Sequence, residues 1–420
     1  MKITIHRGAS QIGGCVTEIR TEKARILIDL GSNLPGSDKP DFTTEEIKRL
    51  TDGVDAIFYT HYHGDHIGFH NLVNPEKQYI GEGAKEVLEW KHKVLARHNE
   101  DKSSLEAVQK MKCYKPEETF TISDDLKITP YYCSHSAFDS YMFLIVAEKK
   151  TILHTGDFRK HGYMGKALIP VLRKYIHQVD ILITEGTMLS RSSEKVKPEC
   201  EIQNEIAGVL RNHKYVFALT SSTDIDRLAS MKEACATAHR NLLADTFQKG
   251  VMDIFTKYTR SSLYKFNGTF NFNGNSLIEN QKIVWKMKHE GFLLPIRCSG
   301  EWLIRMVMGK YNDEEPHLIY SMWSGYYKGT EEQQIKEALT IRSLFKPENI
   351  HDIHTSGHAD CETLAEVCRK VNPRLAIIPI HKDEKSDYRT LDIPQNLKDK
   401  VITESMVVDG VEIEIKPAFN

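Results

Sequence analysis

The chain has 420 residues, 40% hydrophobic and 27% charged, which is typical of a globular protein large enough for two or three domains. Its 56 Lys and Arg residues nearly balance 58 Asp and Glu residues, so the net charge is -2 and a polyanion would have to bind at local basic patches. No apolar stretch approaches the roughly 18 to 20 residues that span a bilayer, which excludes a membrane-spanning helix and argues against a membrane partner.

The amino-terminal segment and the cysteines indicate the cellular compartment. The first residues, MKITIHRG, alternate like a strand and contain no signal-peptide core. The eight cysteines are scattered, and none forms a Cys-x-x-Cys pair. We therefore expect a cytoplasmic protein with reduced thiols. The sequence does not exclude a homo-oligomer.

Six short apolar runs each end on a polar residue that can bind a metal or transfer a proton. They are Arg25 to Asp29, Ala56 to His61, Ile128 to His135, Thr151 to Asp157, Ile181 to Glu185 and Ala376 to His381. Runs of this kind are typical of strands buried on both faces, with helices on each side of the sheet. One run alone would indicate only a strand that ends in a solvated turn. Together they predict an α/β fold whose strand ends form one site.

The densest group of metal-binding residues follows the second run, in the segment His61-Tyr-His-Gly-Asp-His66. The side chains of His61 and His63 would point to the same side of an extended segment, so both imidazoles can bind one cation. Asp65 and His66 would face a second cation. Histidine and carboxylate ligands without thiolate favour zinc or manganese and leave positions for water, as catalytic sites do. The alternative is a chance histidine-rich surface loop.

The sequence pattern changes between about Met188 and Phe345. There, runs such as Tyr215 to Leu219 alternate with helical patterns, which predicts a second, parallel α/β sheet. Strand endings of the site type resume after this segment, at His354 and His381. We therefore predict a domain in two parts, residues 1–188 and 346–420, interrupted by an inserted domain over residues 189–345.

The site residues resemble those of the metallo-β-lactamase family. The pattern His-x-His-x-Asp-His follows a strand, with Ile-Asp-Leu-Gly upstream of it. The resemblance implies a four-layer αβ/βα sandwich with a dinuclear site for two zinc ions, or for manganese. It also implies the role of each residue: His61, His63 and His135 bind one metal, Asp65, His66 and His381 bind the other, Asp157 bridges them, and Asp29 orients the ligand loop.

Within that family, the chain is similar to the β-CASP subgroup, which acts on nucleic acids. The similarity lies in Thr184-Glu-Gly-Thr, the long insertion and His354-Thr-Ser-Gly-His-Ala-Asp360, and it is strongest for the RNase J-like ribonucleases. It implies a zinc-dependent hydrolase that cleaves phosphodiester bonds in RNA, as an endonuclease, a 5′ exonuclease or both. Two departures stand out: Lys382-Asp-Glu384 replaces the usual Gly-Glu after the last histidine, and no further domain of the bacterial RNase J kind follows before Asn420.

Four residues form the expected catalytic set. Asp157 and Asp29 belong to the catalytic set through the metal centre. We expect His358 to act on the leaving oxygen, with Glu185 fixing its tautomer. The alternative for His358 is a helix-start residue. Ser356, beside it, could donate to a phosphate oxygen.

A weaker pattern, Thr220-Ser-Ser-Thr with Arg227, follows a strand and begins a helix. The hydroxyls of Ser221 and Ser222, together with Arg227, could bind a phosphate there, although many helices begin with such residues and bind nothing. Two other functions stay open beside the ribonuclease. One is a small-molecule hydrolase on the same dinuclear scaffold. The other is a metal-stabilised nucleic-acid-binding protein without catalysis.

Overall fold

The computed structural model describes residues 1–37, 39–97, 102–272 and 275–416. The chain divides into two compact units: unit 1 comprises Met1–Lys195 and Gly357–Asn420, and unit 2 comprises Val196–Ser356. Unit 1 is therefore built from both ends of the chain, and unit 2 is inserted into it. No helix among the described residues combines the length and the apolar composition needed to cross a membrane.

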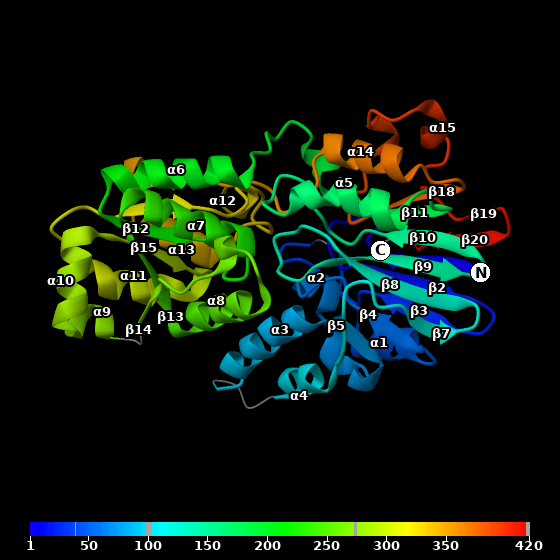
Figure 1. Ribbon diagram of the computed structural model, residues 1–420, viewed down its shortest axis with the longest axis horizontal. Helices are drawn as coiled ribbons and strands as arrows, with labels where there is room; N and C mark the ends of the chain where they lie inside the picture. The colour runs from blue at the N-terminus through cyan, green and yellow to red at the C-terminus, as the bar shows by residue number, and fades with distance from the viewer. Residues whose placement is uncertain (38, 98–101, 273–274, 417–420) are drawn as a thin grey trace. The chain divides into compact units, whose positions relative to one another are not determined.

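Unit 1 contains two mixed sheets (Figure 1). The first sheet is ordered, from one edge to the other, β19 (Met406–Val408), β20 (Val411–Ile415), β1 (Lys2–Arg7), β2 (Val16–Arg20), β3 (Arg25–Ile28), β4 (Ala56–Phe58), β5 (Gln78–Gly81) and β6 (Lys112–Tyr114). The second is ordered β18 (Ala376–Ile380), β11 (Ile181–Glu185), β10 (Lys150–His154), β9 (Tyr141–Ala147), β8 (Leu126–Tyr132) and β7 (Phe120–Ser123).

The two sheets pack face to face because alternate residues of each strand point to opposite sides. In β11, Ile181 and Ile183 join the core between the sheets, whereas Leu182 joins a second core on the outer face. The adjacent strand β18 shows the same division between Ile378 and Ile377. The runs that form β11 and β18 thus belong to strands that are buried on both faces, as the sequence predicts.

Helices cover the outer face of each sheet, which gives unit 1 four layers (Figure 1). The outer core of the second sheet packs against helices α5 and α14 and the segments that flank them. The helices of unit 1 are α1 (Thr44–Thr51), α2 (Gly64–Ile67), α3 (Glu82–Leu95), α4 (Ser103–Lys110), α5 (Leu168–Val171), α14 (Cys361–Val371) and α15 (Gln395–Lys398). The predicted α/β sandwich is confirmed.

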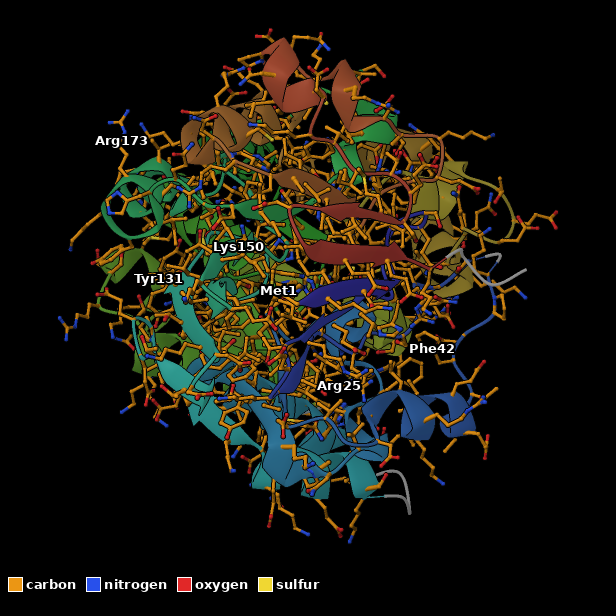
Figure 2. The ribbon with its side chains drawn as sticks, turned by 90° about the vertical axis from the view of Figure 1, so that its right-hand side faces the viewer. Met1, Arg25, Phe42, Tyr131, Lys150 and Arg173 are labelled. Atoms are coloured by element: carbon orange, nitrogen blue, oxygen red, sulfur yellow. The ribbon has the colours of Figure 1, made fainter. Side chains whose placement is uncertain are left out.

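The amino terminus connects the two sheets at the edge seen in Figure 2, where Met1 and Lys150 are labelled. The terminal ammonium of Met1 donates to Glu148 Oε2 at 2.6 Å, and Glu148 lies in the turn between β9 and β10. This contact joins β1 of the first sheet to the second sheet.

Unit 2 has one sheet in which every pairing among the described residues is parallel. Its order is β14 (Phe270–Phe272), β13 (Asn241–Asp245), β15 (Phe292–Ile296), β12 (Tyr215–Leu219), β16 (His317–Tyr320) and β17 (Ile350–Asp352). Its helices are α6 (Glu199–Asn212), α7 (Ile225–Ala238), α8 (Thr246–Tyr258), α9 (Ser276–Glu279), α10 (Gln281–Glu290), α11 (Glu301–Met308), α12 (Gly325–Lys328) and α13 (Lys336–Ser343). The predicted parallel α/β insertion is confirmed as a fold class. The boundaries of this insertion at residues 189–345 stay a prediction.

Candidate metal centre

Strand register in unit 1 brings the predicted site residues to common edges. In the first sheet, β3 and β4 are parallel and pair Ile28 with Phe58, so Asp29 follows one strand beside the start of the histidine loop that follows the other. In the second sheet, β11 and β18 pair Glu185 with Ile380, which places His381 one residue beyond that pair. Parallel strands thus deliver residues from distant parts of the chain to one place.

Three imidazole rings form the first group of this centre. His61 Nε2 lies 3.0 Å from His63 Nδ1, and His135 Nε2 lies 3.3 Å from the same nitrogen. Nitrogens bound to one zinc ion at roughly 2.0 to 2.1 Å in tetrahedral geometry are about 3.3 Å apart. The nitrogens of these rings therefore have the spacing of ligands to a single ion.

A second group contains two carboxylates and two imidazoles. Asp157 Oδ2 lies 3.1 Å from His66 Nε2 and 3.5 Å from His381 Nε2. His381 Nε2 is also 3.1 Å from Asp65 Oδ2. The same Asp157 oxygen is 4.0 Å from His135 Nε2 of the first group. One carboxylate oxygen therefore lies between the two groups.

Hydrogen bonds on the far side of each ring fix which nitrogen faces the centre. His61 Nδ1 lies 3.0 Å from Thr60 Oγ1, His66 Nδ1 donates to Asp29 Oδ2 at 2.7 Å, and His135 Nδ1 donates to Gly357 O at 2.8 Å. With a proton on Nδ1, each ring presents the lone pair of Nε2 to the centre. Asp29 also accepts from the Thr60 backbone N–H at 2.7 Å, so its carboxylate contacts both the His66 ring and the loop that it is predicted to orient.

The buried charges of this centre favour a cation. Burial lowers the pKa of His61 and His135 and that of His63 to about 4, so these rings offer uncharged ligand nitrogens. Burial opposes ionisation of Asp157, yet the charges of His381 and His66 hold the pKa of this carboxyl well below its usual range. In turn, although burial disfavours a charged ring, Asp157 and Asp29 raise the pKa of His66. The imidazole and carboxylate donors, together with the negative charge of Asp157, therefore fit divalent metal ions.

The loop that carries the histidines packs on Gly31 without room for a side chain. A Cβ atom at Gly31 would lie 1.7 Å from the Asp65 carbonyl oxygen. Backbone strain occurs at the site as well, because Asp29 and His381 have positive φ angles of 61° and 49°. Such strain is typical of functional sites held by surrounding structure.

We therefore predict that Gly31→Ala displaces the Asp65 backbone and reduces both the metal content and the melting temperature Tm. The matched control is Gly208→Ala, because a Cβ at Gly208 in α6 meets no atom within 4 Å. That change should stabilise the chain by roughly 0.4 to 1 kcal/mol, as at other helical glycines. Elemental analysis and thermal unfolding measure both variants. Unchanged metal content in Gly31→Ala would show that the loop can move without losing its ligands.

His358 and Glu185 form a pair at the edge of the centre. His358 Nδ1 lies 3.1 Å from Glu185 Oε2 and 3.7 Å from Asp157 Oδ2. Glu185 is fully buried, and its Oε1 accepts from the backbone N–H groups of Phe158 and Ala359. The His358 side chain remains 21% exposed, so the ring can meet a substrate.

Two residues that the sequence pattern does not single out lie next to the centre. Thr187 Oγ1 lies 2.7 Å from His381 Nδ1 and 3.2 Å from His358 Nδ1, and donates to the His381 carbonyl oxygen at 3.1 Å. Thr187 belongs to the Thr184-Glu-Gly-Thr187 segment, which could have indicated it together with Glu185. Cys15 is buried, and its Sγ lies within 4.8 Å of ligand nitrogens of His66 and His381. A single cysteine in an apolar segment gives no such signal.

The predicted substrate contacts lie in unit 2. Arg227 is fully buried and pairs with Glu199 at 3.1 Å and with Ser321. This buried pairing argues against the predicted contact of Arg227 with phosphate. Ser221 is exposed, whereas the Ser222 hydroxyl is buried and has no hydrogen-bond partner among the described residues. Ser356 is half-buried, and phosphate contacts of these three serines stay predictions.

The unusual residues after the last histidine do not move it away from the centre. Lys382 is buried, and its Nζ donates to the Asp383 carbonyl oxygen at 3.2 Å. His381 nevertheless keeps its contacts with Asp65 and Asp157.

Comparison with known protein families gives two matches along the chain. Residues 24–217 match the model of the Beta-lactamase superfamily domain. Residues 345–389, which include His358 and His381, match that of the Zn-dependent metallo-hydrolase RNA specificity domain.

Individual relatives agree with these family matches. The RNase J-like protein of Methanocaldococcus jannaschii is 28% identical over 219 residues, covering 50% of this chain and 49% of that protein. Ribonuclease J of Helicobacter pylori strain B128 is 25% identical over 448 residues, covering 100% of this chain and 61% of that protein. The chain thus spans about half to three fifths of the length of these relatives. The predicted family resemblance is confirmed.

The fold also occurs in a solved structure, that of a protein of unknown function from Enterococcus faecalis V583. The TM-score is 0.68 at 16% identity, and the match covers 92% of this chain and 95% of that one. This likeness supports the fold alone.

Proposed function

We propose that this member of the β-lactamase superfamily is a metal-dependent hydrolase that cleaves phosphodiester bonds in RNA. The observation that carries the proposal is the position of Asp157 Oδ2, which lies between the imidazole group of His135 and that of His66 and His381. A carboxylate in this position can bridge two cations, and paired cations are typical of enzymes that cleave phosphodiesters.

Two zinc ions are the metals that we propose for this centre. His61, His63 and His135 would hold one ion, and Asp65, His66 and His381 would hold the other, with Asp157 shared. Manganese is the alternative ion for the second group. It suits the two imidazoles of this group less well than zinc, because it prefers oxygen ligands. When bound, the two ions supply an activated water and neutralise the phosphodiester charge.

The protein's own residues would position the substrate and move the proton. With Nδ1 of His358 held by Glu185 at 3.1 Å, Nε2 is left to donate a proton to the leaving oxygen. Thr187 would steady both His358 and His381, since its hydroxyl contacts both rings. Asp29 would keep His66 and the Thr60 backbone in place, since it bonds both of them.

RNA is the substrate class that the comparisons favour. Residues 345–389 match the RNA specificity domain, and two of the matching relatives are named as a ribonuclease J and an RNase J-like protein. The net charge of -2 requires the RNA to be held by local contacts rather than by the field of the whole molecule.

We predict that elemental analysis of the purified protein finds two metal ions per chain in this centre. The ligand set offers three terminal groups to each ion and one shared carboxylate. Chelation should remove activity, and added zinc or manganese should restore it. A protein that binds no metal after either ion is supplied would refute the assignment.

The experiment that tests the function compares several substrates with one protein preparation. They are 5′-monophosphorylated RNA, 5′-triphosphorylated RNA, single-stranded DNA and the small diester bis-p-nitrophenyl phosphate. We expect cleavage of RNA that depends on metal. Turnover of the small diester without cleavage of RNA would favour the small-molecule hydrolase. RNA binding by the metal-loaded protein without any cleavage would favour the binding protein.

A further inference from the structure

Unit 2 contains a separate group of three histidines, none of which belongs to the centre described above. His213 follows helix α6 and precedes strand β12 by two residues, His317 begins β16, and His351 lies in β17. The order of these strands in the sheet is β12, β16 and β17, so they are neighbours. The parallel pairing of Val216 with His317 places the group at the amino-terminal edge of the sheet.

The three rings are close enough to bind one ion. One nitrogen of each ring lies within 4.8 Å of the corresponding nitrogens of the other two. His317 Nδ1 and His351 Nε2 are 3.0 Å apart, and the rings of His213 and His317 stack with centroids 3.4 Å apart. Ligand nitrogens around a zinc ion are about 3.3 Å apart. To bind one ion together, the stacked rings of His213 and His317 have to turn so that one nitrogen of each faces the ion.

The surroundings of the group suit a cation that binds uncharged imidazole. Burial, with the nearby His213 and His351, lowers the pKa of His317 to about 4, and burial also lowers the pKa of His351. Both rings are therefore unprotonated at neutral pH. The carboxylates of Glu314 and Glu315 act in the opposite direction on His317, which shows that negative charge lies nearby.

The group is also accessible from solvent. A pocket in unit 2 is lined by Glu205, Asn212, His213, His351 and Asp352, among others. His213 and His351 are half-buried, while His317 is 8% exposed. An ion entering through this pocket would meet two rings directly and the third behind them.

We propose that His213, His317 and His351 bind one further divalent transition-metal ion, of which zinc is the probe of choice. Imidazole is a preferred ligand of zinc, copper and nickel, and three protein ligands leave a position open for water. The ion would connect the amino ends of three adjacent strands, including the edge strand β17. The site is independent of the proposed ribonuclease activity, because no residue of the dinuclear centre takes part.

The test measures zinc content and thermal stability of the full chain. Wild-type protein and the variants His213→Ala and His351→Ala are dialysed against the same free zinc concentration and analysed for metal. We expect each variant to hold one zinc fewer per chain than the wild type, with RNA cleavage retained. Zinc should also raise the Tm of unit 2 in the wild type and not in the variants, because binding to the folded state stabilises it.

The matched control is His289→Ala, which removes an exposed imidazole of the same unit that stacks on Trp285. This variant should keep the full zinc content. Equal zinc content in the wild type, His213→Ala and His351→Ala would overturn the proposal. Loss of one zinc in His289→Ala as well would also overturn it, because it would indicate adventitious binding to surface histidines. The conservative variant His317→Asn provides an independent check, and it should lose the same ion.

Discussion

Asp157→Ala is expected to lose both metal ions of the proposed dinuclear centre together. RNA cleavage should fall by more than about 10⁴-fold, since every function of paired cations would be lost at once. The physical reason is the position of Asp157 Oδ2, 3.1 Å from His66 Nε2, 3.5 Å from His381 Nε2 and 4.0 Å from His135 Nε2. Without this shared anion, two divalent cations would repel each other at close range in a buried site. Elemental analysis and the RNA assay measure the two effects.

The control for this prediction is Asp180→Asn, because Asp180 is also buried in unit 1 and lies outside the centre. Its carboxylate accepts from the Thr151 backbone N–H and pairs with Arg374. This variant should lose stability but keep its metals per folded chain. If Asp157→Ala kept two metals, Asp157 would not be the bridge. If it kept one, Asp157 would belong to a single ion.

Much of the fold could be predicted because burial leaves a clear pattern in the sequence. The run Ile181 to Glu185 is apolar except at its end, and the structure buries its alternate residues in two different cores. The order of strands could not be predicted, because β11 pairs with β18, almost two hundred residues later, and nothing local in either strand specifies that partner. Pairing of this kind depends on the packing of the whole sheet.

The residues that the structure brings together in the candidate metal centre could be selected from the sequence, but their detailed geometry could not. His61 faces the centre through Nε2 and His63 through Nδ1, a difference set by contacts such as that between His61 and Thr60. For Arg227, by contrast, the local sequence pattern does not indicate the partner that the structure shows. Its position after a serine-rich loop suggested a phosphate ligand, whereas its actual partner, Glu199, comes from the preceding helix. A tertiary ion pair leaves no local pattern.

His358→Ala should lower the rate of RNA cleavage by roughly 10²- to 10⁴-fold, the range typical of a general acid, while the metal content stays unchanged. The ring lies beside the centre rather than within its imidazole groups, since its Nδ1 contacts Glu185 at 3.1 Å and Thr187 at 3.2 Å. Removing it therefore leaves the proposed metal ligands in place. The control is His92→Ala, which removes a half-buried imidazole of unit 1 that packs on His70 outside the centre.

Glu185→Gln tests whether His358 acts through its partnership with this buried carboxylate. The amide oxygen can still accept a hydrogen bond from His358 Nδ1, but it no longer stabilises a charged ring. We therefore expect a smaller loss of rate than in His358→Ala, with unchanged metal content. Combining both changes should cause little further loss, because the two residues act as one unit.

If His358→Ala turned over RNA within a few-fold of the wild type, His358 would be only a helix-start residue before α14. Loss of metal in that variant would instead assign His358 to the ligands and release His381 for the proton transfer, since both rings contact the same Thr187 hydroxyl.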